Sequence, residues 1–276
     1  MNKRYNIIKN IIKDNNTILA NFTYLSILQF VRIIIPLIIL PILIRTLGVE
    51  KYGIVIFAQT IVFYFMIITT FGFEMSATKQ ISINRNDKNK VSEIVSAVLI
   101  IKIILFISSG LIFASIMFLI PKMNNYFLLF VFSFLFCLQE ILVPVWFFQG
   151  LEKMRFITII DVVSRVIFLL LIVLFISTKE DYLLVPIFRF IGVIVAGAIS
   201  IYLIFFKEKI KFKLIAKDKL YYYFKDSLPF FYSKFSAVIN DRTNTLLLGA
   251  FLGMSTVRYY DFVYKKYWFL FGFFKV

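Results

Sequence analysis

The sequence predicts an all-α polytopic membrane protein. Three observations point to this class. Of the 276 residues, 61% are hydrophobic, only 17% are charged, and long apolar runs recur from about residue 20 to the last residue. A soluble domain carries about 25% charged residues, and about 20 apolar residues let one helix cross the hydrocarbon core.

The apolar runs divide into eight expected spans. The first seven are long enough to cross a membrane at about 1.5 Å per residue. The eighth stops at Val276, so we expect the chain to be a C-terminally truncated fragment, inactive as it stands. The spans are residues 20–44, 54–76, 94–120, 126–148, 156–177, 183–206, 228–250 and 262–276.

The Lys and Arg residues between the spans predict the orientation. Seventeen lie in the N-terminal tail and in the second, fourth and sixth connections, whereas five lie in the alternate connections. Cytoplasmic loops of membrane proteins are the ones rich in Lys and Arg, so we expect a cytoplasmic N-terminus. The net charge of +16 lies in short loops beside spans, and therefore does not indicate a nucleic-acid partner.

One long basic connection divides the chain. Residues 207–227 alternate Lys with Ile, Phe, Leu and Tyr, which we interpret as an amphipathic helix on the anionic inner leaflet. Residues 1–206 are then expected to form a six-helix N-terminal transmembrane lobe. Residues 228–276 are expected to begin an incomplete second lobe.

Charged residues within spans are the candidates for function, because a charge at the centre of a membrane helix is costly. Arg32 shares a helix face with Pro36, and Pro36 and Pro41 should kink the first span. Lys102 lies about two turns into the third span, from where it either serves a cavity or reaches the cytoplasmic interface. Asp161 and Arg165, four residues apart, are expected to form an ion pair within one helix.

The remaining intramembrane charges lie in the sixth and seventh spans. Arg189 is close enough to the outer end of its span to extend to the interface. In the seventh span, Lys234 and Asp241 are seven residues apart and share a face, while Arg242 turns away from it. Such a helix either lines a polar cavity or packs on the first lobe.

No residue pattern indicates catalysis. The chain has no His, and its single Cys137 lies inside an apolar run. The usual general base and the commonest zinc ligand are therefore missing, and no phosphate-binding glycine loop occurs. We predict no catalytic residues, no metal site and no cofactor.

Four stretches carry a resemblance to a known family: LGVEKYGIVIFAQT (47–60), TTFGFEMSATKQIS (69–82), PVWFFQGLEKM (144–154) and LPFFYSKFSAVINDRTNTLLLGAFLG (228–253). PVWFFQGLEKM is the most specific of them, and its Trp146 is expected to anchor at the inner interface. Gly48 and Gly53 of the first should form a tight outer turn. Together the stretches resemble the Wzx-type, or RfbX-like, polysaccharide and O-antigen flippases of the multidrug/oligosaccharidyl-lipid/polysaccharide exporter superfamily.

The resemblance implies two pseudo-symmetric lobes around a cavity in the bacterial inner membrane. Its implied substrate is a polyprenyl-diphosphate-linked oligosaccharide, such as an O-antigen or capsule repeat unit, moved to the outer leaflet. Polysaccharide polymerase and assembly proteins are implied partners. The expected substrate-binding residues are Arg32, Lys102, Lys234 and Arg242, with Asp241 as an ion-coupling residue. Arg258 before Tyr259 departs from the family pattern.

Other functions stay open on the sequence alone. A multidrug antiporter or a peptidoglycan-precursor flippase belongs to the same superfamily, although the basic cavity residues disfavour cationic drugs. A membrane-embedded glycosyl- or phosphotransferase of the same pathway would need an acidic motif to hold a metal. Asp87 and Glu93 are too scattered to form one.

Overall fold

The computed structural model describes residues 2–253 and 256–263; side chains are described from Leu19 onward, apart from residues 121, 122, 238–242, 244, 246, 249 and 250. Over these residues the chain forms helices joined by short connections, with no strand. The helices are α1 (Asn2–Thr70), α2 (Phe73–Asn84), α3 (Lys88–Leu119), α4 (Pro121–Asn124), α5 (Phe127–Leu135), η1 (Phe136–Leu138), α6 (Gln139–Leu142), α7 (Val145–Gly150), α8 (Met154–Phe175), η2 (Lys179–Leu183), α9 (Leu184–Tyr202), η3 (Leu203–Lys207), α10 (Lys217–Leu247) and η4 (Leu248–Leu252). Residues 256–263 are also helical.

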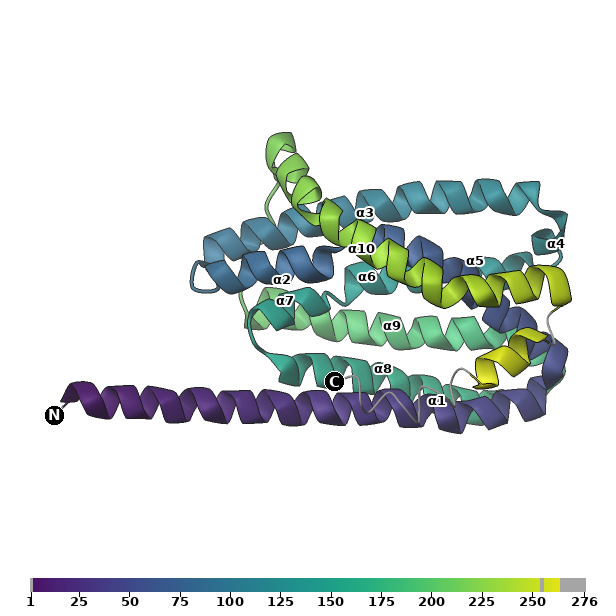
Figure 1. The fold of residues 1–276 in the computed structure, drawn as a ribbon, viewed down its shortest axis with the longest axis horizontal. Coiled ribbons are helices and arrows are strands. Elements are labelled where there is room, and N and C mark those ends of the chain that lie inside the picture. The colour runs from purple at the N-terminus through teal and green to yellow at the C-terminus, as the bar shows by residue number, and fades with distance from the viewer. Residues whose placement is uncertain (1, 254–255, 264–276) are drawn as a thin grey trace.

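Five helical stretches of the described chain are long and apolar enough to cross a membrane, which confirms the predicted class. The first of them is 66 residues long and reverses direction within α1, as Figure 1 shows. The reversal occurs at Gly48, where φ is 77°. The five stretches are Leu19–Asn84, Lys88–Leu119, Phe127–Gly150, Met154–Phe175 and Lys179–Lys207.

The turn at Gly48 confirms one expectation about the first span and revises another. Glycine tolerates positive φ because it has no Cβ, so a single residue joins the two halves of α1. Pro36 and Pro41 do not interrupt α1, whose torsion angles stay helical through both. Neighbouring groups in a membrane bundle can serve the carbonyls that a proline leaves free. The turn within α1 is therefore made by Gly48 alone, since Gly53 is helical.

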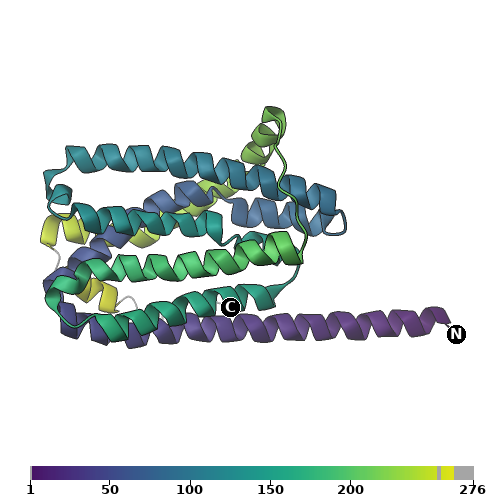
Figure 2. The ribbon, with the colours of Figure 1, turned by 180° about the vertical axis from the view of Figure 1, so that it is seen from behind.

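The connections gather at two opposite ends of the bundle. The N-terminus lies at the same end as the connections α2–α3, α7–α8 and η3–α10 (Figures 1 and 2). The reversal in α1, the α4 region and η2 lie at the other end. This arrangement agrees with the alternation of basic and less basic connections. Which end faces the cytoplasm stays a prediction.

The basic connection differs from the predicted amphipathic helix. Residues 209–216 are not helical, and helix resumes only at Lys217. The backbone of this stretch runs along α3, where the amides of Lys211 and Lys213 donate to the hydroxyls of Ser92 and Ser96 at 3.2 and 2.9 Å. These bonds to a neighbouring helix replace the bonds that a helix would make within the segment.

The expected seventh span covers the second part of α10 and the start of η4. α10 packs against α1, α2 and α3 (Figure 1). α10 is not among the five spanning stretches of the described residues. Its charges at Lys234, Asp241 and Arg242 make it too polar to face lipid all round. Most of the expected eighth span lies outside the described residues.

The fourth expected span is interrupted near its C-terminal end. α6 stops at Leu142 and α7 starts at Val145, with the non-helical pair Val143–Pro144 between them. The following Trp146 is only 1% exposed, so it packs in the protein core and the interface position expected for it is wrong.

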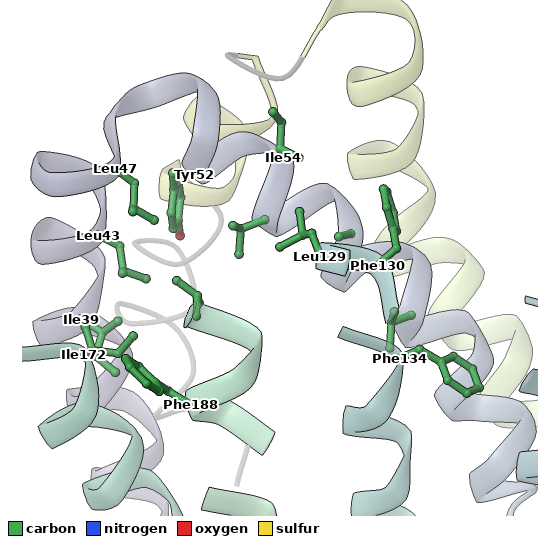
Figure 3. Packing of buried hydrophobic residues seen from close by; sticks show 14 of the residues in the cluster. Ile39, Leu43, Leu47, Tyr52, Ile54, Leu129, Phe130, Phe134, Ile172 and Phe188 are labelled. Carbon is green, nitrogen blue, oxygen red and sulfur yellow. The ribbon is translucent and has the colours of Figure 1, made fainter. Parts of the chain in front are cut away.

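Two clusters of buried apolar side chains hold the bundle together. One lies toward the end with the Gly48 turn and joins both halves of α1 to α5, α8 and α9, as Figure 3 shows for Leu43, Leu129 and Phe188. The other lies toward the opposite end and joins α2, α3, α7 and the start of α10. Polar side chains between these clusters are consequently few and specifically placed.

Candidate functional site

A carboxylate shared by two arginines lies between α1 and α8. Asp161 Oδ2 accepts from Arg165 Nε at 2.7 Å and from Arg32 Nε at 3.1 Å. The pair within α8 confirms the i, i+4 prediction. The contact to Arg32 joins residues 129 positions apart in sequence. The three side chains together carry a net charge of +1.

Both guanidinium groups keep part of their bonding capacity. Each arginine contacts Asp161 through Nε, and no described residue accepts from the Nη groups of either. The side chains of Arg32 and Arg165 are 41% and 32% exposed. A guanidinium presents donors in a planar fork that matches carboxylate and phosphate oxygens. This arrangement therefore suits an anionic ligand that approaches the two forks together.

The Asp161–Arg165 pair also borders a cavity of about 290 Å³. The cavity lies between the two halves of α1, the α5–α6 region, α8 and α9. At the end of the cavity near the Gly48 turn, Tyr52 donates to Asp261 at 2.8 Å, and in Figure 3 the Tyr52 hydroxyl is directed into the space beside α1. Its polar lining consists of Tyr52, Gln59, Thr60, Ser133, Gln139, Asp161, Ser164, Arg165, Arg189 and Asp261.

Arg189 belongs to this cavity, contrary to its expected extension to the outer interface. Its guanidinium lies 3.8 Å from the centre of the Phe136 ring. A cation over an aromatic face is stabilised by the ring quadrupole. The side chain is therefore held inside the bundle.

Lys102 is placed away from the arginines. It is 1% exposed and donates to the Glu140 carbonyl oxygen at 2.8 Å and to Glu140 Oε2 at 3.2 Å. In a regular helix the residue four positions on would donate to that carbonyl, but this residue is Pro144. Lys102 thus supplies the donor that the proline lacks and neutralises the neighbouring carboxylate.

Lys234 joins α10 to α2 by an ion pair with Glu74. Beside it, the hydroxyls of Ser76 and Ser227 are 2.6 Å apart, and Phe71 stacks between Phe224 and Phe231. At this position α10 packs on α2. The remaining two predicted site residues, Asp241 and Arg242, lie in α10, and their side chains are outside the described residues.

The predicted site residues whose side chains are described therefore do not gather at one place. Arg32 joins the Asp161–Arg165 pair, whereas Lys102 and Lys234 each have a different carboxylate partner. Sequence reasoning missed Glu74 and Glu140 as those partners. Pro144 was a usable signal for Glu140, because a proline in a span leaves a carbonyl four residues earlier without its donor. In the described part of the chain no three His, Cys, Asp or Glu side chains gather as a metal site would require.

Comparison with known proteins gives a consistent assignment. The family model described as "Polysaccharide biosynthesis protein" matches residues 18–275. A protein of Escherichia coli (strain K12) named "Putative O-antigen transporter" is 32% identical over 182 residues, which are 66% of this chain and 44% of that protein. A Shigella dysenteriae protein of the same name is 25% identical over 236 residues, covering 84% of this chain and 58% of that protein.

The chain thus spans about half the length of these curated relatives. No solved structure matches it.

Proposed function

Because the chain belongs to the polysaccharide biosynthesis protein family, we propose that it acts in a flippase, moving a polyprenyl-diphosphate-linked oligosaccharide from the inner to the outer leaflet. The names of its relatives, which describe O-antigen transporters, support a transport role. The observation that carries the substrate class is the pair of arginine forks on Asp161. An O-antigen or capsule repeat unit fits this class.

The chemistry of the site suits a diphosphate headgroup. Each charge-assisted bond from a guanidinium to phosphate is stronger than a neutral hydrogen bond, and two forks can engage two phosphates. Asp161 holds Arg32 and Arg165 side by side before the ligand arrives, so their repulsion is already offset. The polyprenyl chain would stay in lipid while the headgroup enters the bundle.

The second lobe would contribute further cations. Lys234 and Arg242 on α10 are proposed to bind the headgroup together with Arg32, and Asp241 to couple transport to an ion. Binding through Lys234 would require it to leave Glu74, and α10 to separate from α2. Rocking of one lobe against the other, as in transporters with alternating access, would supply this separation. For Lys102, a substrate role would require the loss of its bond to the Glu140 carbonyl.

The direct test is binding of undecaprenyl diphosphate to the purified chain, measured by native mass spectrometry. Arg32→Ala and Arg165→Ala should each weaken binding about ten- to a hundredfold, as expected for the loss of about 1.5–3 kcal/mol from one charge-assisted contact. Arg32→Lys should fall between Ala and wild type. Asp161→Asn should also weaken binding, because the two arginines lose the carboxylate that holds them side by side.

The matched control is Arg85→Ala. Arg85 pairs with Glu152 at 2.7 Å in the connections at the end of the bundle, with both side chains about half exposed. Its removal should leave binding unchanged. Unaltered binding in both Ala variants at Arg32 and Arg165 would show that these arginines only stabilise the bundle.

The basic connection is proposed to contact anionic lipid of the inner leaflet, with the N-terminus in the cytoplasm. Lys209, Lys211 and Lys217 are exposed, and so are Phe212 and Leu214 between them. Exposed cations interleaved with apolar side chains suit the headgroup region, where each Lys contributes about 1 kcal/mol. The reconstituted chain should therefore retain phosphatidylglycerol over phosphatidylcholine, and replacing the three lysines by Gln should abolish this preference.

A further inference from the structure

The cavity beside Arg165 contains polar groups that the fold does not use. The side-chain amides of Gln59 and Gln139 line it, and neither bonds to a described residue. The Ser133 hydroxyl also lines it and is buried without a hydrogen-bond partner, in a side chain that is 2% exposed. Ser133 is buried, whereas the two glutamines are partly exposed. Buried polar groups in native structures are nearly always bonded, so an unpaired Ser133 hydroxyl beside two amides without a protein partner needs an explanation.

These groups do not stabilise the bundle in this state. The unpaired buried hydroxyl of Ser133 lowers stability relative to an apolar side chain of similar shape, and Ala at this position would avoid that penalty. The amides of Gln59 and Gln139 make no bond that joins the helices. The three groups come from α1, α5 and α6, three separate helical segments, yet they converge on one cavity. Convergence of spare hydrogen-bonding groups is the arrangement expected of a ligand site.

The chemistry of the lining defines the ligand class. Two amides and a hydroxyl offer both donors and acceptors, and none of them carries a charge. The walls between them include Phe63, Phe136 and Phe168. A ligand that matches has an apolar ring face and hydroxyl groups around its edge. A volume of about 290 Å³ lies at the lower end of the range for small-molecule pockets, so it suits a single ring.

We propose that Gln59, Gln139 and Ser133 form a subsite inside the first lobe that binds one pyranose unit of the transported glycan. The inference rests on the proposed function, since it assigns a place to the sugar next to the diphosphate. Arg165 borders the subsite and is also one of the two forks proposed to bind phosphate. The first sugar, which is attached directly to the diphosphate, is the unit that this geometry admits.

The test uses a panel of methyl pyranosides of hexoses, N-acetylhexosamines and hexuronic acids. The chain is held in nanodiscs, because common alkyl-maltoside detergents would present sugar of their own. Saturation-transfer NMR should detect binding of at least one glycoside to the wild-type chain. Gln59→Met and Gln139→Met, which keep length but remove the amide, should each weaken that binding about tenfold.

A second measurement separates a ligand site from a structural one. Ser133→Ala should unfold at the wild-type temperature or above it, because an unpaired buried hydroxyl has been removed. The two Met variants should also unfold at or above the wild-type temperature, because neither amide bonds to a described residue. Gln149→Met in α7, outside the cavity, is the matched control and should leave glycoside binding unchanged. Lower unfolding temperatures together with unchanged glycoside binding would show that the amides support the fold.

The outcomes also separate this inference from the proposed function. Binding of undecaprenyl diphosphate without binding of any glycoside would overturn the sugar subsite and leave the transport proposal in place. A glycoside that binds the Met variants as tightly as the wild type would place the sugar elsewhere. If the chain binds neither probe, both proposals are wrong.

Discussion

Lys102 Nζ lies 2.8 Å from the carbonyl oxygen of Glu140, the acceptor that Pro144 leaves without a helical donor. The same nitrogen lies 3.2 Å from the Glu140 carboxylate. Lys102 of α3 thus donates the hydrogen bond that is missing where the helix is interrupted between α6 and α7. The interruption is stable because the cation, the carbonyl and the carboxylate are enclosed together.

The first prediction concerns this contact. Lys102→Met should lower the free energy of unfolding by about 3–5 kcal/mol, because it leaves Glu140 charged and unpaired in the core. Adding Glu140→Gln should recover part of the loss. Thermal unfolding in nanodiscs measures both effects, with Lys88→Met on the exposed start of α3 as the control. Normal stability with lost binding of undecaprenyl diphosphate would instead identify Lys102 as a substrate residue.

A second prediction concerns the packing of α8 against α9. A Cβ at Gly192 would lie 2.7 Å from the Ser164 carbonyl oxygen, which is too close for van der Waals contact. Gly192→Ala should therefore force the helices apart and lower stability by about 1–3 kcal/mol. At Gly110 the same added carbon would lie 3.4 Å from Phe134. Gly110→Ala should be tolerated, and equal unfolding temperatures for the two variants would contradict the close α8–α9 approach.

A third prediction concerns the position of α10. Ser76 Oγ and Ser227 Oγ are 2.6 Å apart, so cysteines at both positions should form a disulfide under mild oxidation. In a Cys137→Ser background, Ser76→Cys with Ser227→Cys should show the cross-link after proteolysis between the two sites. Ser82→Cys with Ser227→Cys should not, since Ser82 is exposed on another face of α2. No cross-link in the first pair would mean that α10 does not dock on α2.

A fourth prediction concerns orientation. Lys88 is the first residue of α3 and Lys179 the first of η2, and both are exposed. These two starts lie at opposite ends of the bundle. In a Cys137→Ser background, a membrane-impermeant maleimide added to intact cells should label Lys179→Cys and not Lys88→Cys. Both should react after permeabilisation. The reverse pattern in intact cells would place the N-terminus outside.

The sequence predicted those features that depend on spacing along one element. The Asp161–Arg165 pair follows from the spacing of residues i and i+4 on one helix face, and the turn within α1 follows from Gly48. The additional contact of Arg32 could not be predicted, because it depends on how α1 and α8 rotate against each other. The contact between Lys102 and Glu140 could not be predicted either, because it joins a residue of α3 to a residue of α6.

In the basic connection, the spacing of the lysines indicates an extended backbone, although the segment was interpreted as an amphipathic helix. From Lys209 to Leu214 every second residue is Lys and the residues between are apolar. A strict period of two is typical of an extended chain, whereas an amphipathic helix repeats every three or four residues. The structure has this stretch non-helical. The lysine content therefore suggested a membrane surface, but the spacing indicated the backbone conformation.

The single-residue turn at Gly48 has a consequence for biogenesis. The two halves of α1 have no loop between them that could be threaded through the membrane separately. In the proposed orientation, Arg45, Glu50 and Lys51 surround the turn and must reach the outer face together. The halves should therefore enter the bilayer as one preformed helical hairpin, with the insertion machinery accommodating both at once.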